Sequence, residues 1–522
     1  MRVYHKYMLA GLLGFNIVCC SYIIIQNIKL PENNTPKRSS KGILSINGVP
    51  NSTNQYYDDT SIWNTVLSHP LPRDSKDSTK RNFVRMRNNI KESIQDNLTT
   101  ENMENEVNPD IRWGFPGDVY KLQERLRGIL FTDRVLHVGV VGSSASVPKT
   151  LNNSTYAEMF SSWLGMMMES EVKVHNIGLK SGNSEYFSWC LESHLNVGNM
   201  DIILIETAGV DYDLQEVYIR NNYVNAGRPL EELTRKVLSS PGRPIPIYVN
   251  FPSMSDIQSR NCISAEYFAH NSLAKYYNIT TVSWNEAFCS KMWRIYNVIE
   301  PDTESFTLRV HKQIMLVLLN NFKKLLTKIS LEEIHNTQSG SEFVISSKHL
   351  SENLSTHYGS VQHVAATPRK PMNSDVWLRE PRCWLASKRQ HVLNPIASQS
   401  WRFVEGELGR YWESNRRNDQ TYFTISVHHK INHRSVVSMT QVSCKACGQA
   451  LVWLNHDLSS ATLVESKSEY ITSLVHEIAW NVAPGKHTIW IENLEDKLFR
   501  VSAVMVGYKE MPKQLNYMYR NW

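Results

Sequence analysis

A serine-rich turn after an apolar run is the first part of the sequence that could do chemistry. The stretch VLHVGVVGSSASV, residues 135–147, carries β-branched apolar residues into Gly142, Ser143 and Ser144. A serine in such a turn becomes a nucleophile when a base within hydrogen-bond reach takes its proton. Ser144 is therefore the candidate nucleophile. The alternative is that Ser144 only keeps a strand-to-helix turn tight and caps the helix that follows.

Three more polar stretches lie further along the chain, two of them directly after apolar runs. They are NIGLKSGNSEY at 176–186, ETAGVD at 206–211 and PDTESFTLRVH at 301–311. Ligands of a parallel sheet bind outside the carboxyl ends of its strands, so we expect these stretches to line one site with Ser144. Glu206 at this site is either an acid, a base or a sugar acceptor, or a paired structural carboxylate that orients the loops.

The segments around these stretches alternate as strands and helices do. Helical patterns at PGDVYKLQERLRGILF and VHKQIMLVLLNNFKKLLTKI begin and end the series. Between them, short β-branched runs are separated by helix-length segments such as TYAEMFSSWLGMMME, SEYFSWCLESHL and SAEYFAHNSLAKYY. The runs are VLHVGVV, EVKVHNIG, MDIILIETA, PIPIYVNFP and ITTVSW. This alternation predicts an α/β domain over 109–330 with a doubly wound parallel sheet.

The pattern changes after this domain. Residues 331–373 lack strong periodicity and are typical of a linker. Within 374–512, turns such as APGK separate strand-like runs, which are TYFTISVHH, SVVSMTQVSC, ALVWLN, ATLVES, HTIWIEN and FRVSAVMVGY. Short strands at this spacing predict a C-terminal antiparallel β-sandwich of jelly-roll type, and residues 513–522 form a tail.

The four polar stretches, in this order, resemble the SGNH or GDSL-type hydrolases. They are most similar to a eukaryotic membrane-anchored, capsular-associated-like branch with an all-β domain after the hydrolase fold. The resemblance covers residues 116–330 and extends more loosely to SWRFVEGELG and APGKHTIWIEN. It implies a flavodoxin-like sheet and an esterase that needs no cofactor or metal. It also implies a serine nucleophile, an oxyanion hole that includes a glycine and an asparagine, and an Asp-x-x-His pair.

The resemblance assigns the nucleophile to Ser144 and the acid to Asp302, while His311 fits a later histidine of the last motif. The chain departs from the family at the other catalytic positions. Lys180 or Ser181 stands where the family has its oxyanion glycine, and Gly182 is a substitute if the loop is shifted. Val210, before Asp211, stands at the position of the oxyanion asparagine, and Ser305 stands at that of the catalytic histidine.

These departures remove the groups that would make Ser144 reactive. A serine at 305 has no useful basicity near neutral pH, and the side chain of Val210 donates no hydrogen bond. The loss of one oxyanion donor alone typically costs about a hundredfold to a thousandfold in rate. His311 could replace the base if its loop differs from the family, but otherwise packs on the closing helix. His270 is a helix-surface or core histidine by the same reasoning.

The N-terminus carries an apolar run that is long enough to cross a bilayer. Residues 7–25, YMLAGLLGFNIVCCSYIII, follow Arg2, His5 and Lys6. The basic flank predicts a cytosolic tail at 1–6 and a lumenal or extracellular body, which makes the chain a single-pass type II membrane protein. A signal peptide that is cleaved near Ser21 is the alternative. Residues 26–108 are rich in polar residues and are typical of a stem.

Glycosylation sequons and cysteines agree with a body in the Golgi or ER lumen or at the cell surface. The sequons are Asn33, Asn51, Asn97, Asn152, Asn153, Asn278 and Asn353. Six cysteines beyond the anchor permit three disulfides of open connectivity, and they are Cys190, Cys262, Cys289, Cys383, Cys444 and Cys447.

Two further patterns in the sandwich region have competing explanations. His429, His433, Cys444 and Cys447 have a spacing that superficially suits zinc, but lumenal cysteines more often form disulfides. Tryptophans could stack on sugar rings or could belong to the core, and the candidates are Trp401, Trp412 and Trp453.

Charge excludes one class of partner. The formal net charge is only +6 over 522 residues, and no Lys/Arg cluster is interleaved with aromatics, which argues against nucleic acid. We therefore expect a membrane-anchored, glycan-directed protein with a glycan or glycoprotein ligand and a degenerate catalytic set. An active O-acyl esterase or acyltransferase that uses Ser144 is the alternative.

Overall fold

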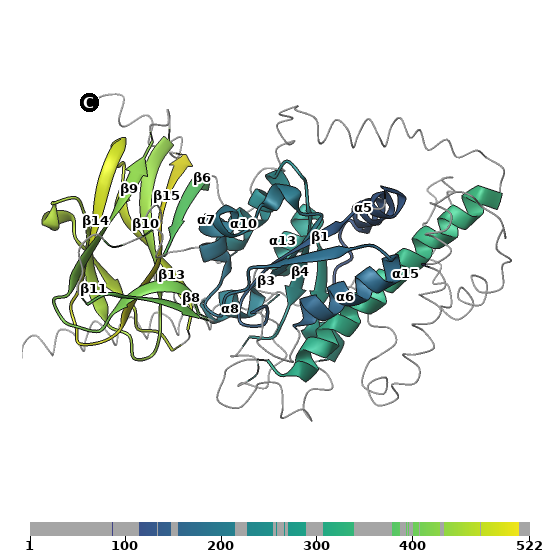
Figure 1. Ribbon diagram of the computed structural model, residues 1–522, viewed down its shortest axis with the longest axis horizontal. Helices are drawn as coiled ribbons and strands as arrows, with labels where there is room; N and C mark the ends of the chain where they lie inside the picture. The colour runs from purple at the N-terminus through teal and green to yellow at the C-terminus, as the bar shows by residue number, and fades with distance from the viewer. Residues whose placement is uncertain are drawn as a thin grey trace, which may run out of the picture. The chain divides into compact units, whose positions relative to one another are not determined.

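A computed structural model of the chain describes 16 separate stretches of residues, which together include both predicted domains. The described residues are 86, 114–132, 134–147, 155–214, 227–253, 257, 266, 270–288, 306–338, 378–386, 393, 395, 400–406, 408–428, 433–469 and 471–510. The chain divides into two compact units, Met1–Asn64 and Thr65–Trp522, and every described residue belongs to the second. The α/β domain ends with a helix at residue 338, and the sandwich begins with a strand at residue 378 (Figure 1).

Five parallel strands form the sheet of the α/β domain in the order β2-β1-β3-β4-β5. The strands are β1 (Leu136–Gly142), β2 (Val172–Asn176), β3 (Ile202–Glu206), β4 (Ile245–Asn250) and β5 (Thr280–Ser283). This is the flavodoxin-like order of a doubly wound sheet, and it confirms the predicted fold class. Every residue of β3 and β5 is buried, because helices cover both faces of the sheet.

Helices lie on both faces of this sheet. Figure 1 shows β1, β3 and β4 between α7 and α10 on one side and α6 and α15 on the other. The helices are α5 (Val119–Thr132), α6 (Tyr156–Met168), α7 (Ser184–His194), α8 (Ala208–Asp213), α10 (Arg228–Ser239), α13 (His270–Tyr277), α14 (Trp284–Phe288) and α15 (Leu308–Gln338). Helix α15 extends to Gln338, into the segment expected to be a linker, because neither glycine nor proline interrupts LEEIHNTQ.

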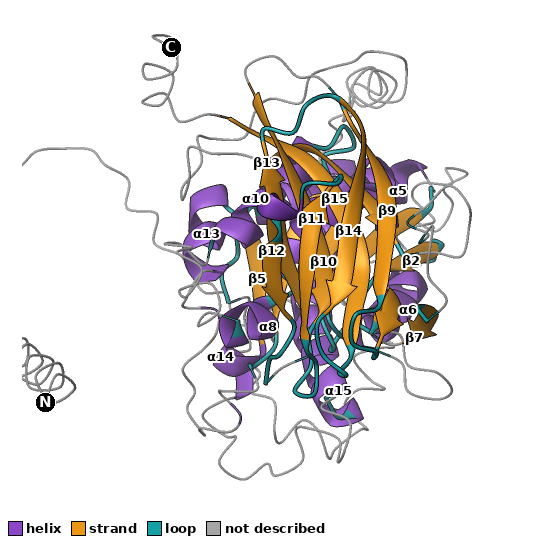
Figure 2. Ribbon diagram, turned by 90° about the vertical axis from the view of Figure 1, so that its left-hand side faces the viewer, coloured by secondary structure: helices purple, strands orange, loops and turns teal. Residues whose placement is uncertain are grey.

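The C-terminal domain is a sandwich of two antiparallel sheets, as predicted. One sheet has the order β13-β10-β15-β8-β7 with β6 also paired to β15, and the other has the order β12-β11-β14-β9 (Figure 2). The strands are β6 (Leu378–Leu385), β7 (Arg402–Gly406), β8 (Gly409–Ser414), β9 (Gln420–Val427), β10 (His433–Val442), β11 (Gln449–Leu454), β12 (Thr462–Glu465), β13 (Ser473–Trp480), β14 (Gly485–Asn493) and β15 (Phe499–Glu510). Between the sheets lies an apolar core that includes Phe423, Val452 and Ile489.

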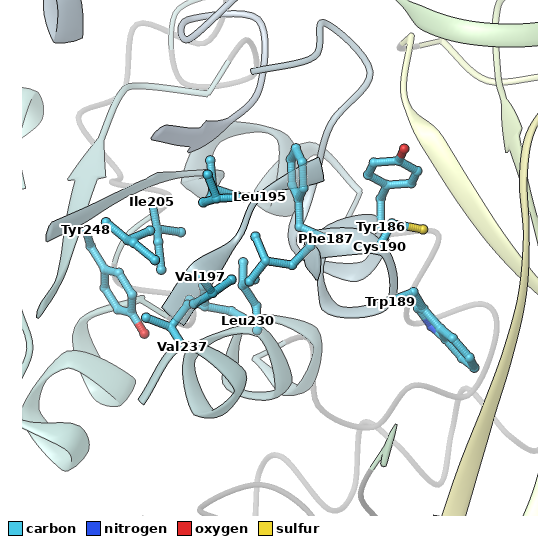
Figure 3. Close-up of a cluster of buried hydrophobic side chains, with 14 of the residues drawn as sticks. Tyr186, Phe187, Trp189, Cys190, Leu195, Val197, Ile205, Leu230, Val237 and Tyr248 are labelled. Carbon is cyan, nitrogen blue, oxygen red and sulfur yellow. The ribbon is translucent and has the colours of Figure 1, made fainter. Parts of the chain in front are cut away.

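A second apolar core joins the two domains around α7. It includes Phe187, Cys190 and Leu191 of α7, and it also includes Val436 of β10 and Met505 of β15. Figure 3 shows the part of this cluster that surrounds α7. A disulfide between Cys190 and Cys383 links the helix covalently to β6.

Several sequence predictions lie outside the described residues. These are the tail at 1–6, the apolar run at 7–25, the stem at 26–108 apart from residue 86, the tail at 513–522, Cys262, Cys289, and the sequons Asn33, Asn51, Asn97, Asn152, Asn153 and Asn353. No helix in the described part of the chain is long and apolar enough to cross a membrane. The remaining sequon, Asn278, is exposed in the turn after α13.

Candidate functional site

The turn after β1 is built around one buried carboxyl group, that of Glu206. Glu206 ends β3 and pairs in register with Gly142 on β1. Its Oε2 accepts a hydrogen bond from the backbone N–H of Ser143 at 3.0 Å, and its Oε1 accepts one from the Ser143 hydroxyl at 2.8 Å. The Ser146 hydroxyl donates to Oε2 at 3.1 Å. Two serines of the turn therefore point toward Glu206, whereas Ser144 between them is half-buried.

The environment of Glu206 favours its neutral form. Burial raises the pKa of this carboxyl to about 8, and the charge of Asp211 adds to the rise, although the hydrogen bonds from Ser143 and Ser146 oppose it. Burial and the charge of Glu206 also raise the pKa of Tyr156, whose hydroxyl lies 3.1 Å from Ser146 Oγ. At neutral pH Glu206 is thus mostly a protonated carboxyl group, hydrogen-bonded beneath the turn.

The loop between β2 and α7, residues 177–183, lies directly against this turn. The Leu179 N–H donates to the Gly142 carbonyl at 3.0 Å, and Asn176 Nδ2 donates to the Ser146 carbonyl at 2.8 Å. A Cβ atom on Gly178 would lie 2.5 Å from the Ser146 carbonyl, so glycine permits the backbones to touch. The sheet therefore brings the first two polar stretches of the sequence together.

The donors expected in this loop are bonded within the protein. The N–H of Gly182 donates to the Leu179 carbonyl at 2.7 Å. Ser181 is buried, and its hydroxyl donates to the Leu408 carbonyl of the sandwich at 3.0 Å. Lys180 is half-buried in the same turn. The Gly182 N–H and the Ser181 hydroxyl are thus both occupied by bonds within the protein.

The position expected for the oxyanion asparagine lies beside a buried polar cluster. Val210 is half-buried in α8, and its neighbour Asp211 accepts hydrogen bonds from the backbone N–H of Ser184 at 3.0 Å and from the Ser184 hydroxyl. His270 Nε2 lies 3.5 Å from Asp211 Oδ2. Serine, aspartate and histidine meet here, but the aspartate stands between the other two. A nucleophilic triad needs the histidine in that place, so this cluster is not one.

The histidine proposed as a substitute base is buried among aromatic rings. His311 lies in the first turn of α15 and is 1% exposed. Its ring centroid lies 6.3 Å from that of Tyr156 and 6.0 Å from that of Phe251. These contacts agree with a packing role. Asp302 and Ser305 lie outside the described residues.

The two patterns noted in the sandwich have structural explanations. Cys444 and Cys447 form a disulfide, so they offer no thiolates and the zinc interpretation is wrong. His429 and the side chain of His433 lie outside the described residues. Trp401 belongs to the apolar core between the two sheets, and the Trp412 indole N–H donates to the Leu393 carbonyl at 2.9 Å. Trp453 is not part of that core: it pairs across strands with Trp490 of β14 and stacks on it, with ring centroids 6.1 Å apart.

The chain was compared with known families, curated proteins and solved structures. No family model matches the sequence, and no curated protein matches it. One similar solved structure is a two-domain esterase (CEX) active on acetylated mannans, co-crystallised with mannopentaose. It shares 15% sequence identity with this chain at a TM-score of 0.49, and the alignment covers 78% of this chain and 99% of the esterase chain. A catalytic mutant of Axe2, an acetylxylan esterase from Geobacillus stearothermophilus, shares 14% identity at a TM-score of 0.30, with 36% of this chain and 93% of its own covered.

The sandwich alone is similar to a smaller structure. The CBM36-1 domain of a multidomain xylanase from the hindgut metagenome of Trinervitermes trinervoides shares 9% identity at a TM-score of 0.19 and covers 24% of this chain and 96% of its own. At these identities the similarities concern the fold, and the chemistry has to be argued from the residues of this chain.

Proposed function

We propose that the chain is a membrane-anchored, glycan-directed protein of the secretory pathway whose SGNH-hydrolase-like domain keeps the nucleophile turn but has lost its base. One observation carries the proposal. None of the segments that follow the five strands at the carboxyl edge of the sheet contains a histidine, and those segments are 143–155, 177–183, 207–227, 251–269 and 284–307.

The two histidines nearest to these segments in the sequence, His270 and His311, both contact residues other than Ser144. His270 lies 3.5 Å from Asp211 and its ring packs on Tyr248. His311 is buried against Tyr156 and Phe251. Because a serine hydroxyl needs a base within hydrogen-bond reach, this arrangement argues against ester hydrolysis by Ser144.

An O-acyl esterase or acyltransferase is the second candidate, and it is the activity for which the similar two-domain structure is named. One observation of this chain favours it. Ser143 and Ser146 are both bonded to Glu206, whereas Ser144 in the turn after β1 is half-buried. Asp302 would keep the acid position, and the base would be a displaced His311 or another group.

One set of measurements separates the two candidates. The full-length protein is assayed for acetate release from acetylated mannan and from aryl esters, and for binding of the same mannan. We expect binding without turnover, and we expect Ser305→His, which restores the family's base position, to raise turnover above background. Turnover by the natural chain that Ser144→Ala abolishes would overturn the binding proposal in favour of the esterase.

The membrane anchor and the compartment are part of the same proposal. The run at 7–25 is expected to retain the chain in membranes after carbonate extraction, with the body protected from added protease in intact vesicles. Release of the chain into the soluble fraction would instead favour a cleaved signal peptide.

A further inference from the structure

We propose that the sandwich is a positioning part of the Ser144 site, because it holds the loop at 177–183 against the turn after β1. This inference rests on the proposed function, since it assumes that a ligand binds at this edge of the sheet. It assigns the positioning role to Ser181 and Asn183. The sandwich would then act as more than an attached module with a binding site of its own.

The loop is hydrogen-bonded to the sandwich along its buried side. The Ser181 carbonyl accepts from the Ser473 N–H at 2.7 Å, and the Ser181 hydroxyl accepts from the Ser473 hydroxyl at 3.0 Å and donates to the Leu408 carbonyl at 3.0 Å. Asn183 Nδ2 donates to the Ser473 carbonyl at 2.6 Å and to Thr472 Oγ1 at 3.0 Å. Ser181, Asn183, Thr472 and Ser473 are all at most 1% exposed. The loss of one partner at this closed interface would therefore leave the other donor or acceptor unsatisfied.

Helix α7 fixes the same interface from the other end. Its Cys190 is bonded to Cys383 of β6, and the Ser193 hydroxyl donates to the Cys383 carbonyl at 3.0 Å. Figure 3 shows Tyr186 and Cys190 on the side of α7 nearest the sandwich strands. The loop and the helix that follows it are thus held by one rigid surface.

The opposite side of the loop touches the turn that carries Ser144. Backbone hydrogen bonds and close contacts at Gly178, Leu179 and Gly182 join the loop to Gly142 and Ser146. A Cβ atom on Gly182 would lie 2.8 Å from the Gly142 carbonyl. Any shift of the loop therefore changes the wall beside Ser144, and displacements of about 1 Å are enough to spoil a binding geometry.

Asn183→Asp tests the inference with little change of shape. The aspartate keeps the oxygen that accepts the Tyr186 N–H at 2.9 Å and caps α7, but it places an oxygen where Nδ2 donates to Ser473. We expect amide hydrogens of 177–183 to exchange about tenfold faster, and the affinity for acetylated mannan to fall about tenfold, as for the loss of a buried hydrogen bond.

Two further variants make the outcome decisive. Ser460→Ala, the matched control, removes a side-chain hydrogen bond within the sandwich, to the Asp457 carbonyl, and should change neither readout. Thr472→Val removes one acceptor from the sandwich side alone, and it replaces Asn183→Asp if that variant does not fold.

Each outcome has one meaning. Unchanged exchange at 177–183 in a folded variant overturns the inference, and so does faster exchange with unchanged affinity in a chain that binds mannan. If the natural chain binds no glycan, the proposed function fails. Hydrogen exchange then still decides whether the sandwich holds the loop.

Discussion

Replacing Glu206 by glutamine removes a titrating group from beneath the Ser144 turn while keeping its shape. In acid, the natural carboxyl is neutral, and the amide differs mainly by placing a donor where Ser143 or Ser146 requires an acceptor. That mismatch costs about 1–3 kcal/mol of unfolding free energy. Near neutral and alkaline pH the comparison changes, because only the natural chain has a proton to lose at this position.

The size of the change follows from the pKa of Glu206. The folded chain holds this proton up to a pKa of about 8, whereas the unfolded chain releases it near the ordinary glutamate pKa of 4.5. The folded pKa is the raised one, so its contribution to stability is full below pH 4.5 and is lost as the pH rises through 8. From pH 5 to pH 8 the natural chain loses about 3–4 kcal/mol of unfolding free energy that Glu206→Gln does not lose. The variant should therefore become the more stable chain at the alkaline end.

Urea unfolding of the full-length protein at pH 5, 6.5 and 8 measures this difference. The unfolding free energy of the natural chain minus that of Glu206→Gln should decrease steadily over the series. Glu171→Gln, at a side chain that is 61% exposed, is the control and should follow the natural chain. A difference that stays constant within about 0.5 kcal/mol from pH 5 to pH 8 would show that Glu206 is ionised in the folded protein, and would refute the reasoning.

Three other changes have outcomes that the structure sets. Gly178→Ala should lower the free energy of unfolding in urea by about 3 kcal/mol, because the added Cβ atom would lie 2.5 Å from the Ser146 backbone. Its control is Gly128→Ala, whose Cβ atom would have nothing within 4 Å, and which should raise the same free energy by up to about 1 kcal/mol. Cys383→Ser, which removes the disulfide to α7, should cost about 2–5 kcal/mol in the same assay and lower the melting temperature. If Asn278 carries a glycan, Asn278→Gln should migrate faster than the natural chain on a gel, and the difference should disappear after endoglycosidase treatment. An unchanged band would mean that this exposed sequon carries no glycan.

The parallel sheet could be predicted because its signal is local. Each of its strands is a short apolar run between helix-length segments, and all five form where the sequence indicates. The sandwich was predicted less completely, since β6, β7, β8 and β13 were missed. Strand β6 contains Pro381, which disfavours a strand in sequence patterns but is tolerated here, because the pairing with β15 shifts register between Val506 and Tyr508.

The site was harder to predict because its contacts join residues that are far apart in the chain. Glu206 was recognised as a strand-end carboxylate, but its bonds to Ser143 and Ser146 span about 60 residues and leave no local pattern. The bonds from Asn183 to the sandwich span about 290 residues. Asn183 follows Gly182 and Asp211 follows Val210, and both of those were candidate oxyanion positions. Sequence adjacency to these candidates was the signal that could have pointed to Asn183 and Asp211.

The apolar core shared by α7 and the sandwich also sets the order in which the chain can fold during synthesis. Cys190 is separated from its partner Cys383 by 193 residues. A ribosome that adds about 5–20 residues per second needs about 10–40 s to make that partner after α7 has emerged. Throughout this interval the residues that the sandwich adds to the cluster around α7, among them Val436 and Met505, have not yet been made. The packing around α7 can therefore be completed only after most of the chain has been translated.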